Sequence, residues 1–228
     1  MSSEDPLQVG LVALFVTALV VAQVTASTLL AFSLPVALPV VGDSLVMPGA
    51  ALAYALTFFA SDCYAELYGR RAATIVVNVG FAMNFVLLAL VWSTILAPGL
   101  PPAAQPVDPA AFRSVLAAST GIVAASLAAY VVSQNWDVFV FHAIREYTDG
   151  DHLWLRNVGS TASSQLIDTV IFIGVGFVLF QGVPLSAALS LLVGQYLLKL
   201  LIAVLDTPFV YAVVRFAPDR DESTAPAF

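Results

Sequence analysis

The chain alternates between long apolar segments and short segments rich in proline, glycine and charged residues. Because about 20 apolar residues in a helix cross the hydrocarbon core of a bilayer, each long segment predicts a membrane-spanning helix. Pro35 and Pro39 predict an outer loop after the first of them. The pattern predicts an all-α polytopic membrane protein with one domain, whose six spans cover about residues 8–32, 48–68, 72–97, 114–142, 159–181 and 186–214.

Composition supports this class. Hydrophobic residues make up 60% of the 228 residues and charged residues 10%, with a mean hydropathy of +0.94, whereas soluble domains contain about 25% charged residues. The first residues lack the positive charge of a cleavable signal peptide, so the first span is expected to stay in the mature protein. A net charge of −7 with a single lysine suits a high-salt cytoplasm and predicts a halophilic archaeon as the source. Nucleic acid is not an expected partner, because there is no basic patch.

Arginines predict the orientation in the membrane. Arg113 alone falls on the side opposite the N-terminus, and the other loop arginines fall on the N-terminal side: Arg70, Arg71, Arg145, Arg156, Arg215 and Arg220. Basic residues concentrate on the cytoplasmic side of membrane proteins. Both termini are therefore predicted to be cytoplasmic, in a multi-pass protein of the cell membrane.

The fifth span carries polar residues where the bilayer penalises them. An unpartnered carboxylate in hydrocarbon is costly, so a polar side chain there predicts a function. The fourth span echoes the fifth: residues 133–141 and 164–172 share the pattern Ser-Gln-x-x-Asp-x-x-x-Phe. Consecutive spans run antiparallel, so the repeat has opposite topology, as inverted repeats have around a transporter's central site. We expect a substrate site formed by Gln134, Asp137, Gln165 and Asp168.

Further polar residues recur at helical spacing. Asp62 and Glu66 lie one turn apart, with Arg70 a turn later as a partner for Glu66. Asn84 lies in the third span, and Gln195, Lys199 and Asp206 share one face of the sixth. Lys199 is the only lysine, so it should face a carboxylate or a water-filled cavity. A structural Asp168–Lys199 ion pair is the alternative to a role in transport, and a helix–helix hydrogen bond is the alternative for each isolated amide.

Several chemistries lack their motifs. There is no phosphate-binding loop of the GxxxxGK[ST] type, no Gly-x-Ser-x-Gly elbow and no His-Glu-x-x-His pair. Cys63 is a single cysteine, and no cluster has metal-ligand spacing, so neither a disulfide nor a metal or other cofactor is expected. Transport or binding is favoured over catalysis.

An ordered set of motifs lies within residues 50–215. It comprises residues 62–70, Gly80 and Phe81 with Asn84, Ser133 and Gln134 with Asp137, residues 154–157 leading to residues 164–169, and residues 206–208. Together these motifs resemble the queuosine precursor transporter family, also called the vitamin uptake transporter family.

The resemblance implies a six-helix importer of 7-deazaguanine bases such as 7-cyano-7-deazaguanine, which feed queuosine or, in an archaeon, archaeosine in tRNA. A guanine-like edge offers a ring N–H and an amine, and a carboxylate such as Asp168 or Glu66 can accept both. Gln134 and Gln165 can match edges of the base that carry both hydrogen-bond donors and acceptors, and Phe58 or Phe172 could stack on the base. The expected roles are substrate binding for Gln134, Asp137, Gln165, Asp168, Glu66 and Asn84, and charge balance or proton coupling for Asp62, Lys199 and Asp206.

Three alternatives stay open at this stage. A substrate-binding subunit of an energy-coupling-factor importer would need an external ATPase, and an intramembrane hydrolase would use Asp137 and Asp168. A purely structural scaffold leaves the paired polar stripes unexplained. Sequence separates neither proton coupling from facilitated diffusion nor a monomer from a homo-oligomer.

Overall fold

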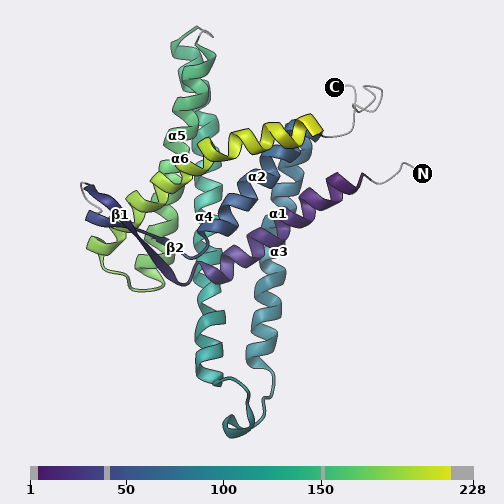
Figure 1. Cartoon of the computed structure of the whole chain (residues 1–228), viewed down its shortest axis with the longest axis vertical. Coiled ribbons are helices and arrows are strands. Elements are labelled where there is room, and N and C mark those ends of the chain that lie inside the picture. The colour runs from purple at the N-terminus through teal and green to yellow at the C-terminus, as the bar shows by residue number, and fades with distance from the viewer. Residues whose placement is uncertain (1–4, 39–41, 150–151, 217–228) are drawn as a thin grey trace.

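Helices dominate the computed structural model, which describes residues 5–38, 42–149 and 152–216 (Figure 1). The long helices are α1 (Pro6–Thr25), α2 (Ala51–Tyr68), α3 (Arg70–Leu96), α4 (Pro109–Tyr147), α5 (Leu153–Phe172) and α6 (Leu185–Phe216). A π-helical segment, η2 (Ile173–Leu179), continues α5, and a short 3₁₀ turn, η1 (Pro102–Ala104), lies between α3 and α4. Strands β1 (Leu29–Leu38) and β2 (Gly42–Pro48) join α1 to α2.

Within the described residues, five helical segments are long and apolar enough to cross a membrane: Pro6–Thr25, Arg70–Leu96, Pro109–Tyr147, Val158–Leu179 and Leu185–Ile202. They support an all-α polytopic membrane protein. Helix α2 carries both Asp62 and Glu66 and is not among these five. Its crossing, and therefore the count of six spans, stays a prediction.

Local sequence sets the helix ends. Asp5 accepts a hydrogen bond from the Leu7 amide, and Asp108 accepts from the amides of Ala110 and Ala111, so both aspartates cap the helices that follow them. Gly69 has φ 85° and separates α2 from α3 by a single residue. Because glycine adopts positive φ readily, the chain can reverse there without a loop.

The first predicted span, 8–32, is wrong at its C-terminal end. Helix α1 stops at Thr25, and the expected outer loop is an antiparallel hairpin that pairs Leu29 with Pro48 and Ser33 with Ser44. Pro35 lies inside β1 at an irregularity of the pairing, and Pro39 lies outside the described residues. An apolar run does not by itself distinguish a strand from a helix, so hydropathy carried the prediction too far.

The fifth apolar segment, Val158–Leu179, lies within two residues of the predicted span 159–181, but the helix that contains it was not fully anticipated. Helix α5 begins at Leu153, and the helix changes to π geometry from Ile173 to Leu179. The Phe180 amide accordingly donates to the Val175 carbonyl, five residues back. Such π segments occur often at functional sites. This one directly follows the Ser-Gln-x-x-Asp segment of α5.

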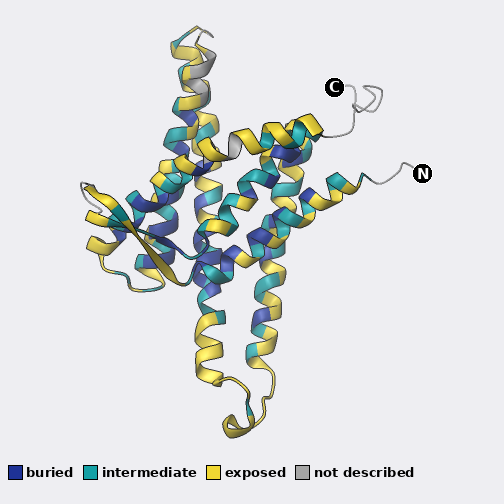
Figure 2. Ribbon diagram, in the orientation of Figure 1, coloured by how far each residue is buried: buried dark blue, intermediate teal, exposed yellow. Residues whose placement is uncertain are grey.

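The buried residues gather where the helices cross, and the ends of α4 are exposed (Figure 2). The core there is rich in alanine, and its members include Ala22, Ala26, Ala50, Ala125, Ala129, Phe172 and Phe177. Small residues let helix backbones approach closely in membrane proteins. Gly80 has the same effect on α3, because a side chain there would overlap Phe15 of α1.

Helix α4 organises the shape of the molecule. Its 39 residues correspond to a length of about 58 Å, roughly twice the hydrocarbon core of a bilayer. It lies beside α3 over one half and beside α5 over the other (Figure 1). The two copies of the repeated motif, residues 133–141 and 164–172, lie in α4 and α5, so the hairpin formed by these helices holds both.

Candidate functional site

An ion pair lies between α5 and α6. The Nζ atom of Lys199 is 2.5 Å from Oδ2 of Asp168, and the side chains are 9% and 25% exposed. A lysine on an apolar helix needs a counter-charge, because neither group is stable alone in a low-dielectric interior. Lys199 thus faces a carboxylate, as its position on an apolar helix predicted.

The two copies of the repeat bond to each other reciprocally. Ser133 of α4 donates to Oδ1 of Asp168 at 3.4 Å, and Ser164 of α5 donates to Oδ1 of Asp137 at 3.1 Å. In each helix the serine precedes the aspartate by one turn, so the two share a face. Antiparallel packing then places each serine opposite the other helix's aspartate. Lys199 breaks the symmetry, because among the described residues it pairs with Asp168 and not with Asp137.

A second line of contacts reaches this centre from α1 and α2. Tyr54 packs edge-on against Phe172, with ring centroids 6.3 Å apart. Ser126 donates to Oε1 of Gln23 at 3.4 Å. Polar contacts therefore involve α1, α4, α5 and α6, and α2 adds the aromatic contact of Tyr54.

Sequence reasoning missed Gln23, Tyr54 and Ser126 as members of this network. A signal was present for Gln23, since it is an amide well inside a mainly apolar helix. Tyr54 and Ser126 gave none, because single hydroxyls are common in membrane helices.

Four amide side chains have buried atoms without a hydrogen-bond partner among the described residues. The atoms are Nε2 of Gln23, both amide atoms of Asn84, Nε2 of Gln181 and Oε1 of Gln195. Most buried polar groups in proteins are paired, so each of these requires an explanation. Asn84 and Gln195 keep the inward positions that their sequence faces predicted.

Not all predicted residues join the centre. Gln134 is exposed on α4, because it follows Ser133 by one residue and so points about 100° away from the packed face. Gln165 is half-buried. Phe58 packs against Tyr54, with ring centroids 6.5 Å apart. The side chain of Asp206 lies outside the described residues.

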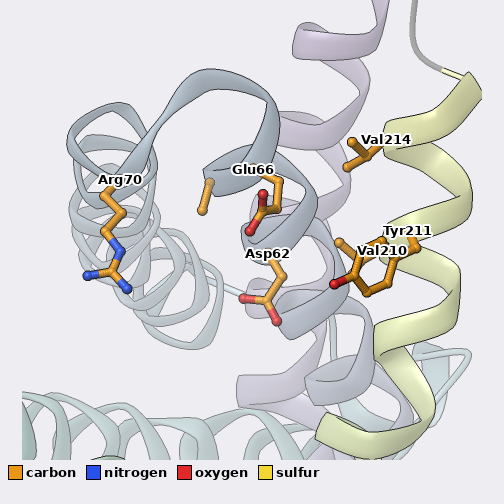
Figure 3. Close-up of a pocket in the computed structure, with 7 residues that line it drawn as sticks. Asp62, Glu66, Arg70, Val210, Tyr211 and Val214 are labelled. Carbon is orange, nitrogen blue, oxygen red and sulfur yellow. The ribbon is translucent and has the colours of Figure 1, made fainter. Parts of the chain in front are cut away.

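Asp62 and Glu66 line a separate cavity of about 420 Å³ between α2 and α6 (Figure 3). Its other lining residues are Ala65, Arg70, Val210, Tyr211 and Val214. Figure 3 shows the Arg70 guanidinium directed away from Glu66, and the described residues contain no ion pair between these two. The expected Glu66–Arg70 pair is therefore wrong, because the turn at Gly69 starts a new helix between the two residues and the i, i+4 geometry is lost.

The site chemistry is that of binding by hydrogen bonds and charge. Within the described residues there is no group of three side chains suited to a metal ion. Asp137 and Asp168 each bond to a serine of the opposite helix, rather than to each other as a shared-proton pair would. This arrangement does not favour the aspartyl hydrolase.

Apolar spanning helices around a charged pair and a reciprocally bonded helix hairpin define a class, the polytopic membrane transporter. Residues 48–213 match the family described as "Putative vitamin uptake transporter", and the chain belongs to this family. It is also 34% identical over 172 residues to the "Probable queuosine precursor transporter" of Bacillus subtilis (strain 168), with 75% of this chain and 73% of the relative covered. No solved structure matches the chain significantly.

These comparisons confirm the family predicted from the ordered motifs. A transporter binds a small molecule and lies in a bilayer, so both of these coarse expectations hold. Membership in a family of transporters also argues against catalysis.

Proposed function

We propose that the protein imports a 7-deazaguanine base, such as 7-cyano-7-deazaguanine, across the cell membrane into the cytoplasm. The observation that carries the proposal is the Asp168–Lys199 pair at the contact of the two repeat helices. The relative named for a queuosine precursor supports the substrate class.

Asp168 is the proposed anchor for the base. Oδ1 and Oδ2 can together accept the ring N–H and the exocyclic amine of a guanine-like edge. Lys199 remains nearby as the counter-charge, so a neutral base can bind without adding net charge to the membrane interior. Phe172, one turn from Asp168, and Tyr54 beside it offer aromatic surfaces for the ring.

Alternating access follows from the repeat. Rocking of α4 against α5 would exchange the reciprocal serine–aspartate bonds and expose the site to one side at a time. We assign Asp137 and Gln165 to the substrate path within this hairpin. Gln134, which is exposed here, would join the site only after a rotation of α4. Asn84 is assigned as a further polar contact from α3.

The cavity between α2 and α6 is the proposed cytoplasmic exit. It lies at the C-terminal ends of α2 and α6, next to Arg70 at the start of α3, on the side predicted to be cytoplasmic. Glu66 would bind the departing base there, and Asp62 would supply charge balance. Asp206, on the sixth helix between Lys199 and the cavity residues, is assigned to charge balance on the same route.

Ligand binding to the purified protein tests the proposal directly. A ligand that binds only the folded state raises the melting temperature, by the equivalent of about 2.7 kcal/mol at a hundredfold excess over Kd. We expect a rise with 7-cyano-7-deazaguanine, none with biotin, and loss of the rise in Asp168→Asn. Asp43→Asn, an exposed residue of β2, is the matched control and should keep it.

Uptake by liposomes that contain this protein alone tests the transport step. Accumulation of the base without an ATPase would exclude the energy-coupling-factor subunit. Uptake that does not respond to a protonophore would indicate facilitated diffusion rather than proton coupling. A folded protein that binds no deazapurine would contradict the proposed function.

A further inference from the structure

The ammonium group of Lys199 uses one of its three N–H bonds in the pair with Asp168. Its Nζ atom donates to Oδ2 of Asp168, and the other two N–H bonds have no acceptor among the described residues. The lysine side chain is 9% exposed, so these donors lie inside the protein. A buried donor without an acceptor lowers stability. The ion pair therefore leaves Lys199 with donors for a further acceptor.

Asp168 keeps acceptor positions of its own. Oδ2 accepts from Lys199, and Oδ1 accepts from Ser133 at 3.4 Å. Because a carboxylate oxygen has two acceptor positions, each of the two oxygens retains one. The side chain of Asp168 is 25% exposed, so a ligand can approach it. Such a ligand meets the carboxylate and the neighbouring ammonium group together.

The pair presents one donor beside two acceptors. Lys199 bonds to Oδ2 and Ser133 bonds to Oδ1, so Nζ lies on the Oδ2 side of the carboxylate. The order of the three atoms is thus Nζ, Oδ2, Oδ1. Nζ and Oδ2 are 2.5 Å apart, and the two oxygens, which share one carbon, are about 2.2 Å apart. The spacing along this row is nearly even.

A guanine-like base carries the complementary order on one edge. Its carbonyl oxygen, ring N–H and exocyclic amine are an acceptor, a donor and a donor. Neighbouring groups of this edge share one sp² carbon and are about 2.3 Å apart, close to the spacing of the row on the protein. When Oδ2 accepts from the ring N–H and Oδ1 from the amine, the carbonyl oxygen adjoins the ring N–H on the side of Nζ.

We infer that Lys199 is a specificity-determining residue, which donates a hydrogen bond to the ring carbonyl of the base held by Asp168. The inference rests on the proposed function, because Asp168 is the anchor in both, and it gives Lys199 a contact with substrate in addition to its charge. A base with an amine in place of the carbonyl presents a donor to the ammonium group and is rejected. The pair therefore selects heterocycles that carry the complete carbonyl–NH–C–NH₂ edge.

Two ligands and one variant test the contact. The ligands are 7-cyano-7-deazaguanine and its analogue with sulfur in place of the carbonyl oxygen, which keeps the ring N–H and the amine. Sulfur is a weak acceptor, so the wild-type protein should prefer the carbonyl ligand about 10-fold, as expected for a hydrogen bond from a charged donor. In Lys199→Met this preference should disappear. Isothermal titration calorimetry in detergent measures the four affinities.

The ratio of the two affinities separates a carbonyl contact from charge balance. Loss of the counter-charge in Lys199→Met affects both ligands equally and cancels in the ratio, whereas loss of the carbonyl contact affects only one. Arg113→Met is the matched control, because it also removes one positive charge, at an exposed position of α4. This control should keep the preference of the wild-type protein.

The outcomes also separate the inference from the proposed function. Equal affinity of the wild-type protein for the two ligands would overturn the inference, and this comparison requires no variant. The wild-type preference, if retained in Lys199→Met, would come from the larger size of sulfur and would overturn the inference as well. Binding of the carbonyl ligand in either case would leave the proposed function in place. Wild-type protein that binds neither ligand would overturn both.

Discussion

The charge of Lys199 is buried on an apolar helix and is matched by a single carboxylate. Burial of two charges is costly, and their attraction offsets that cost only while both are present. Ser133 adds a hydrogen bond to the free oxygen of Asp168. The pair is therefore a local constraint on sequence, in which neither residue can change alone without a penalty.

Replacing Asp168 and Lys199, singly and together, gives a double-mutant cycle. Asp168→Asn should destabilise the protein by about 3 kcal/mol, because it leaves the nearly buried charge of Lys199 unpaired, and Lys199→Met should cost less, because Asp168 is 25% exposed and keeps its bond from Ser133. The double variant should recover most of this loss. Thermal unfolding in detergent gives the stability of the wild-type protein, the two single variants and the double variant. If the loss in the double variant equals the sum of the two single losses, the two charges do not interact.

A transport assay should distinguish the role of Asp168 in binding the base from its role in stabilising the fold. The double variant is expected to fold but not to bind the base, because the carboxylate acceptor is gone. Uptake by a stable double variant would place the substrate elsewhere.

At the scale of elements, the β-hairpin packs directly on α6. Any side chain at Gly194 would overlap the backbone carbonyl oxygen of Val46 in β2. Gly194 precedes Gln195 and lies about one turn from Lys199 on the same helix. Because Gly194 has no side chain, β2 of the hairpin can pack closely against α6, the helix that carries Lys199.

Gly194→Ala should destabilise the protein by about 1–3 kcal/mol, as overpacking of a close contact does. The obstacle is backbone, so neither partner can move aside by a side-chain rotation. A lower melting temperature in detergent is the expected result.

Gly10→Ala provides the control, since a side chain at this position of α1 meets no atom within 4 Å. It should be neutral or stabilising by up to about 1 kcal/mol, because alanine favours a helix more than glycine does. A Gly194→Ala protein as stable as this control would contradict the close packing of β2 on α6.

At the scale of the whole molecule, the distribution of arginines predicts the orientation in the membrane. The β-hairpin should then lie outside the cell, and the α4–α5 connection should lie in the cytoplasm. The single native cysteine, Cys63, is buried, so it gives little background in labelling experiments.

Cysteines placed at the two ends test this orientation. Ser33→Cys lies on an exposed position of β1, and Tyr147→Cys replaces a side chain that is 90% exposed at the end of α4. A membrane-impermeant maleimide should label the first in intact cells and the second only after lysis. The reverse labelling pattern would show that the topology is opposite to the predicted one. The cavity at Asp62 and Glu66 would then open to the outside of the cell rather than to the cytoplasm.

The sequence alone determined the class of the protein and the composition of much of its centre. Long apolar segments require helices in a bilayer, because backbone groups there must bond within their own segment. The Ser-Gln-x-x-Asp repeat identified Asp137 and Asp168, and the lone lysine identified Lys199. These features are local or compositional, so they can be read without coordinates.

Only the tertiary structure decided which of these residues meet. It showed that the Asp168–Lys199 pair, one of the alternatives read from the sequence, forms, left Gln134 exposed, and brought Ser126 to Gln23 and Tyr54 to Phe172. It also replaced the end of the first predicted span and the outer loop by a β-hairpin. The physical reason is that hydropathy and helical spacing fix a side chain's face on its own helix, whereas its partner depends on how the helices pack against one another.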